Sequence, residues 1–108
     1  GRMFMEISPH AKRLAEEIRA ICAPEKIFLY HAKFDLHGQM TSFKICVVAS
    51  AADKAALERK IYLSLDCDLP YDLVLYTPEA WEACMQNPHS FAGIIREKGV
   101  LLYDQAQA

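Results

Sequence analysis

The segment Phe43–Ala49 constrains the fold of this chain more than any other part of the sequence. It is largely apolar on both faces, and Ile45–Ala49 is the longest uninterrupted apolar run. A strand with this pattern belongs inside a covered sheet, because neither of its faces can be left in water. The run is far shorter than a membrane-spanning helix, so it does not predict a membrane partner.

Helical and strand patterns alternate along the rest of the chain. They predict, in order, a helix from Ser8 to before Pro24, strands at 26–34 and 43–49, a helix at 52–65, a strand at 71–76, a helix from 78 to about Asn87, a helix from Ser90 to Lys98 and a strand at 100–103. The helix starts rest on capping residues followed by proline or by helical spacing, as at Thr77-Pro78. This order predicts one α/β (α+β) domain over residues 3–105, with a small mixed sheet of about four strands packed with about four helices.

Composition excludes several classes of protein. The chain has 108 residues, 53% of them hydrophobic, which is typical of a globular domain with its own core. The chain has twelve basic and fourteen acidic residues, for a net charge of −2, and no basic stripe supports nucleic-acid binding. The four cysteines are widely spread in apolar contexts, and no signal peptide pattern is visible. These features predict buried thiols in a reducing cytoplasm.

Two C-terminal segments resemble a known family. Leu69–Glu79 is similar to the family's third strand, with its acid, and to the helix start that follows it. Asn87–Tyr103 is similar to the closing helix and strand. On these segments the chain resembles the minimal nucleotidyltransferases of the DNA polymerase β superfamily, an antitoxin-like group (MNT) found in bacteria and archaea beside HEPN-domain partners. The resemblance covers about Glu25–Asp104 and implies a nucleotidyltransferase-like fold.

The chemical motifs of that family are replaced in this chain. By gap-free alignment, the family's Gly-Ser pair falls on His31 and Ala32, and the two acids of its Asp-x-Asp motif fall on Phe43 and Ile45. The third acid is retained as Asp72. In the family, the paired carboxylates hold Mg²⁺ ions that bind a triphosphate and activate the attacking hydroxyl. A single carboxylate is a poor Mg²⁺ site, so we expect no metal and no catalytic residue beyond the residual Asp72.

The leading hypothesis is therefore a degenerate, catalytically inactive nucleotidyltransferase-like domain. The resemblance implies a protein-interaction or regulatory module, antitoxin-like, with a HEPN-type toxin or a second copy of the chain as partner, and without a cofactor. Phe43 and Ile45 are expected to face the former catalytic cleft. They would leave there an apolar surface that a partner can cover.

Two alternatives remain open from the sequence. An active nucleotidyltransferase would transfer a nucleoside monophosphate from ATP, with Mg²⁺, to a protein or small molecule. It requires Asp35, Asp66 or Asp68 to converge on Asp72. A nucleotide-sensing domain would instead need a phosphate-sized pocket near His31.

Several polar residues have a second interpretation. His31 and His37 could hold a transition metal if a third ligand lay near them. His10 and His89 are predicted to be exposed residues at helix starts. Lys44 is expected to be exposed or to line the emptied cleft, because it points to the opposite face from its neighbours in the strand.

Overall fold

The computed structural model describes residues 2–107, with side chains from His10 onward. Its elements are α1 (Arg2–Ile21), β1 (Lys26–Phe34), β2 (Met40–Val48), α2 (Lys54–Ser64), β3 (Tyr71–Tyr76), α3 (Pro78–Met85), α4 (Phe91–Lys98), β4 (Val100–Asp104) and a final 3₁₀ turn η1 (Gln105–Gln107). The strands form one sheet in the order β3-β2-β1-β4. β2 and β3 are parallel, whereas β1 is antiparallel to both β2 and β4. The predicted mixed α+β domain with a four-stranded sheet and four helices is confirmed.

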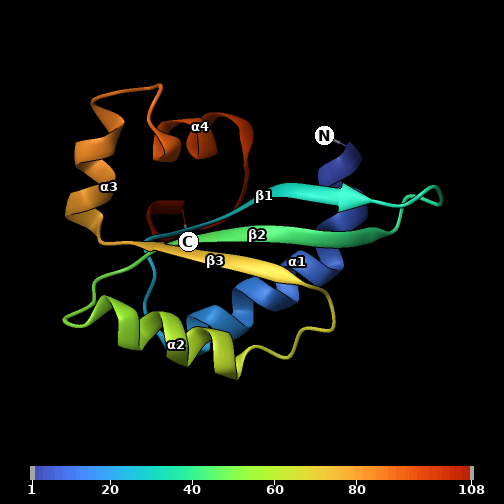
Figure 1. Ribbon diagram of the computed structural model, residues 1–108, viewed down its shortest axis with the longest axis horizontal. Helices are drawn as coiled ribbons and strands as arrows, with labels where there is room; N and C mark the ends of the chain where they lie inside the picture. Colours follow the sequence, from blue (N-terminus) through green and yellow to red (C-terminus); the bar gives the residue numbers. More distant parts are fainter. Residues whose placement is uncertain (1, 108) are drawn as a thin grey trace.

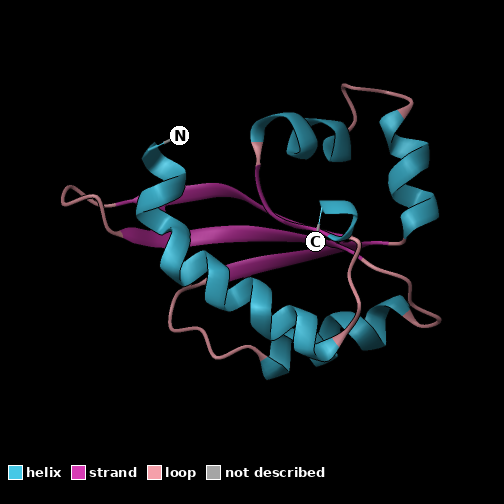
Figure 2. Ribbon diagram, turned by 180° about the vertical axis from the view of Figure 1, so that it is seen from behind, coloured by secondary structure: helices cyan, strands magenta, loops and turns pink. Residues whose placement is uncertain are grey.

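Helices cover both faces of the sheet. α1 and α2 lie on one face, and α3 and α4 lie on the other (Figure 1). Seen from behind, α1 crosses the sheet diagonally (Figure 2). Residues alternate along β2, so Ile45 and Val47 pack beneath α1 and α2, while Cys46 and Val48 pack beneath α3 and α4. The prediction that this strand is buried on both faces is confirmed.

The second face is covered over only part of its area. Trp81 of α3 is 2% exposed, stacks on Phe28 and meets the edge of Tyr76, which anchors α3 to the sheet. The side chains of His31 and Asp72 are exposed on strands of the same sheet. An open area therefore remains on the sheet, and the candidate site lies there.

Capping residues explain where the later helices begin. Thr77 accepts a hydrogen bond from the Ala80 N–H, and Ser90 accepts one from the Gly93 N–H, as expected for N-caps. Asp53 caps α2 in the same way. The predicted starts at Thr77 and Ser90 are confirmed. Within residues 2–107, no helix combines the length and the apolar character needed to cross a membrane.

The N-terminal helix differs from its prediction. α1 begins at Arg2, so the Ser8-Pro9 pair lies inside the helix and does not start it. A proline inside a helix removes one N–H donor and its ring crowds the preceding turn, so α1 continues through Pro9 against a local cost. The residues before Pro9 include good helix formers such as Met5 and Glu6. His10 is consequently not an exposed residue at a helix start. It is half-buried, its ring meets the edge of Phe43, and its Nε2 has no hydrogen-bond partner among the described residues.

The four cysteines are unpaired thiols in the structure. Cys46 is fully buried in the sheet, and the other three are half-buried (Cys22, Cys67 and Cys84). Burial raises the pKa of the Cys46 thiol to about 12. A thiol with this pKa is protonated and inert at neutral pH, so Cys46 acts as a small hydrophobic residue of the core.

Candidate functional site

A β-bulge at His31 forms one side of the candidate site. Tyr30 pairs with Lys44 and Lys33 pairs with Ser42, so two residues of β1 lie opposite one residue of β2. His31 adopts φ of 48°, in the left-handed region that a side chain with a Cβ rarely occupies. The resemblance aligns a glycine with this position. A backbone that favours glycine is therefore present here although the residue is histidine.

An ion pair crosses from β2 to β3 on the open area. Lys44 lies opposite Asp72 in the parallel pairing, with Nζ 3.9 Å from Oδ2. The two side chains are 43% and 79% exposed. Water screens an exposed pair of this kind, so it contributes little to stability. Its importance lies in the charge that it places beside the Asp72 carboxylate.

These residues border a cavity of about 330 Å³. It is lined by His31, Lys33, Ser42, Phe43, Lys44, Pro70, Tyr71 and Asp72. Two lysines and an imidazole surround a single carboxylate. The cavity thus carries more positive than negative groups, which suits an anionic group better than a metal cation.

A second, more apolar cavity of about 280 Å³ adjoins His31. It is lined by Tyr30, His31, Phe91, Ile94, Ile95, Lys98 and Gly99. Tyr30 and Phe91 meet edge to face at 5.8 Å between ring centroids, and Phe91 and Ile94 are 50% and 42% exposed. Burial raises the pKa of Tyr30 to about 12, helped by Cys46, Tyr76 and Asp72, so its phenol remains protonated at neutral pH. His31 borders both cavities.

The expectation for Phe43 and Ile45 is wrong. Their side chains are 2% and 0% exposed in the core beneath α1 and α2, so they leave no apolar surface for a partner. The cause is the register of the sheet: Asp72 lies opposite Lys44, and residues that pair directly point to the same face. Phe43 instead stacks on Tyr71, with 5.5 Å between ring centroids.

The β2 residues that line the cavity on the face of Asp72 are Ser42 and Lys44, which sequence reasoning did not single out as a pair. Their spacing of two residues, in a strand otherwise rich in apolar side chains, is the signal that could have found them. Lys33, opposite Ser42, was missed as well. Ala32, which the resemblance aligns with the serine of the family's Gly-Ser pair, is half-buried against the α1 and α2 side of the core.

The other acids do not reach Asp72. Asp35 accepts hydrogen bonds from the N–H groups of His37 and Gln39 in the β1–β2 turn. The backbone of Asp66 bonds to Glu17 and Arg13 of α1, and Asp68 is exposed. Neither these acids nor His37 line the cavity that Asp72 borders. In the described part of the chain, no group of three or more His, Cys, Asp or Glu residues is arranged to hold a metal ion.

Comparisons with protein-family models, curated proteins and solved structures give no match to this chain.

Proposed function

We propose that this chain is a nucleotidyltransferase-like domain that has lost the two-metal centre and acts as a protein-interaction or regulatory module, antitoxin-like, in the cytoplasm. The observation that carries the proposal is the position of Lys44, which lies opposite Asp72 and places an ammonium group beside it. Ser42, which lies two residues before Lys44 on the same face of β2 and lines the same cavity, is neutral.

An ammonium group beside the remaining acid opposes metal binding. Two-metal transfer needs several carboxylates that converge on both ions, whereas the cavity offers one. Mg²⁺ keeps its water ligands unless carboxylates and phosphates replace them together. The Lys44 charge also supplies the positive partner of Asp72 that a metal would otherwise provide. This arrangement supports a scaffold without transfer chemistry, and neither Mg²⁺ nor ATP has a role in it.

The partner in this proposal is a protein, either a HEPN-type toxin or a second copy of the chain. Exposed apolar side chains support such a contact at more than one place. Phe91 and Ile94 flank the apolar cavity, while Tyr62 and Leu63 stand exposed on α2. Large apolar side chains that gather on a surface are typical of interaction sites.

Calorimetric titration with ATP, with and without Mg²⁺, tests the loss of the metal centre. We expect no Mg²⁺-dependent heat from the wild-type chain and no difference when Asp72→Asn is titrated. Mg²⁺-dependent binding that Asp72→Asn abolishes would contradict the proposal and favour an active nucleotidyltransferase. A transfer assay with labelled ATP then decides whether that site is catalytic.

Nucleotide sensing is a second candidate, which the charges around the cavity favour. Lys33, Lys44 and His31 surround the space and can receive phosphate groups, while the apolar cavity beyond His31 can receive a planar group. In the same titration, this function predicts binding that is indifferent to Mg²⁺ and weakened by Lys33→Ala. The absence of heat at millimolar ATP would reject it.

A further inference from the structure

β3 presents an unpaired backbone edge. It forms one end of the sheet, and no described strand pairs with its outer side. The Phe43 N–H donates to the Pro70 carbonyl and the Ala49 N–H donates to the Tyr76 carbonyl, so the even residues of β3 direct their backbone groups toward β2. By alternation, Tyr71, Leu73 and Leu75 direct their N–H and C=O groups outward. The strand contains neither proline nor lysine, the residues that commonly protect such edges.

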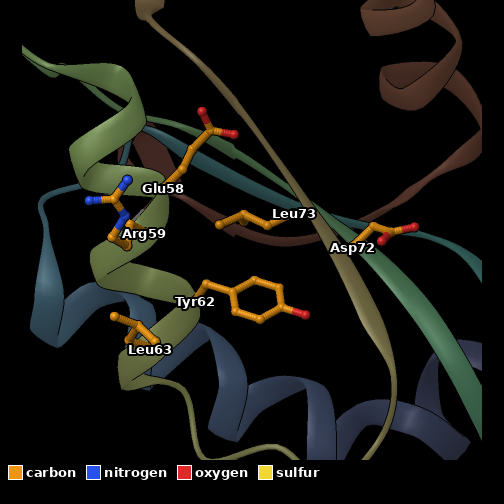
Figure 3. A pocket seen from close by; sticks show the side chains of 6 residues that line it. All are labelled: Glu58, Arg59, Tyr62, Leu63, Asp72 and Leu73. Carbon is orange, nitrogen blue, oxygen red and sulfur yellow. The ribbon is translucent and has the colours of Figure 1, made fainter.

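A groove of about 520 Å³ runs along this edge. It is lined by Glu58, Arg59, Tyr62, Leu63, Asp72 and Leu73. In Figure 3, Tyr62 points from α2 toward β3, Leu73 points from β3 toward α2, and the Asp72 side chain points away from the groove. Tyr62 and Leu63 are 54% and 77% exposed. The groove thus joins a free backbone edge to an exposed apolar wall.

We propose that the β3 edge pairs antiparallel with β3 of a second copy of the chain, about a two-fold axis at Leu73. The two sheets then form one continuous sheet, and the two α2 helices lie on the same side of it. The partner's Leu73 points into the groove beside Tyr62 and Leu63, because directly paired residues share a face. The proposal rests on the proposed function in one respect, namely that the chain acts through contact with a protein.

The edge is complementary to itself, which favours a second copy over an unrelated strand. With the axis at Leu73, Leu73 pairs with the partner's Leu73 and Tyr71 pairs with the partner's Leu75. Every residue with outward backbone groups then meets another of the same kind. Asp72 lies opposite the partner's Val74, so the one charge of the strand does not oppose itself.

The surface of α2 that borders the groove is also complementary to itself. α2 carries one acid and one base there, Glu58 and Arg59, so the charges of one copy can be balanced by those of the other. An isologous interface requires such self-complementarity, because the same patch faces itself across the axis. Because these two charges have opposite signs, the groove does not complement a strongly acidic or strongly basic peptide.

Sedimentation velocity of the full chain over a wide range of concentration tests the proposal. We expect a dimer, and we expect Leu63→Glu to shift it to monomer, because the change places two additional acids near the axis. Leu36→Glu is the matched control: Leu36 is fully exposed on the β1–β2 turn, so the same substitution there should leave the dimer intact. A chain that is monomeric at every concentration overturns the proposal, as does a dimer that Leu63→Glu leaves unchanged.

A cysteine at the axis tests the register. In a hydrogen-bonded antiparallel pair the Cα atoms are about 5.5 Å apart, within the range of a disulfide. Leu73→Cys should therefore give a covalent dimer on mild oxidation, whereas the wild-type chain with its four native thiols should not. A Leu73→Cys chain that sediments as a dimer but forms no crosslink would overturn this register. The ATP titration reports on the cavity beside Lys44 and Asp72, whereas these experiments report on the β3 edge. Failure of the dimer and failure of the proposed function are therefore distinguishable.

Discussion

Lys44 and Asp72 lie directly opposite each other on parallel neighbouring strands, with 3.9 Å between Nζ and Oδ2. This pairing determines which residues of β2 share a face with Asp72. Beside Asp72 these are Ser42 and Lys44, followed on the same face by the buried Cys46 and Val48, whereas Phe43 and Ile45 point into the core on the other face. The pair therefore identifies positions 42 and 44 as those where carboxylates could bind a metal together with Asp72.

Placing acids at these two positions should create a cation site. In Ser42→Asp/Lys44→Asp, two carboxylates join Asp72 on one face, and the competing ammonium group is gone. We expect Mg²⁺ or Mn²⁺ binding in calorimetry that the wild-type chain lacks, because converging carboxylates are the ligands these ions prefer. Far-ultraviolet circular dichroism should show a fold unchanged from wild type, since both positions are partly exposed.

Phe43→Asp/Ile45→Asp is the matched control for that gain. These positions are 2% and 0% exposed, so the same acids would be buried without partners. We expect the variant to lose its cooperative unfolding transition, because each unpaired buried charge costs several kcal/mol. A folded Phe43→Asp/Ile45→Asp that binds Mg²⁺ would show that the register of β2 and β3 is different.

The His31→Gly variant should be more stable than the His31→Ala variant. His31 has φ of 48°, and a Cβ in this region costs about 1–2 kcal/mol. In an ordinary strand alanine is the more stable by about 0.5–1 kcal/mol. Urea denaturation of His31→Gly and His31→Ala should therefore give the reverse of the usual order. If alanine is the more stable of the two, the left-handed backbone at the bulge is refuted.

Stability should fall steeply at alkaline pH. Burial raises the pKa of Cys46 from 9.0 to about 12 and that of Tyr30 from 10.0 to about 12. As pH rises, the unfolded chain loses these protons at a lower pH than the folded chain does. The contribution of the two groups to the free energy of unfolding is therefore fully present below about pH 9 and is lost as pH rises toward 12. Each group adds a slope of about 1.4 kcal/mol per pH unit in its own window.

Urea denaturation at a series of pH values measures this loss. Cys46→Ala removes one titrating group, at the cost of a small cavity that lowers stability equally at all pH values. Between pH 9 and 10 its slope should be smaller than that of the wild-type chain. Identical slopes would mean that Cys46 does not hold its proton in the folded state.

Replacement of Ser90 should lower the stability of the chain more than replacement of an ordinary helix cap. Its Oγ accepts from the Gly93 N–H at 3.0 Å and donates to the Cys84 carbonyl at 2.9 Å, so it caps α4 and ties it to α3. Ser90→Ala should cost about 2 kcal/mol of stability, from the cap and the second bond together. Asp53→Ala, which removes only the bond to Ala56, should cost about 1 kcal/mol in the same thermal or urea experiment. Equal costs would mean that the Cys84 bond contributes nothing.

The sequence alone determined the type and order of the elements. The apolar pattern of β2 predicted a strand buried on both faces, and Thr77 and Ser90 predicted the starts of α3 and α4, because capping and alternation are local properties of the backbone. Sequence reasoning misplaced the start of α1, because the Ser8-Pro9 pair suits a helix start and the first turn of a longer helix is not marked by any stronger signal.

Only the tertiary structure decided which face each residue of β2 occupies. A strand that is apolar on both sides carries no mark of its orientation, and a shift of one residue exchanges its two faces. The pairing of Lys44 with Asp72 and the bulge at His31 resolve that ambiguity, because they are set by neighbouring strands far away in the sequence. For the same reason the open area beside Lys44, and the free edge of β3, could not be located from the sequence by itself.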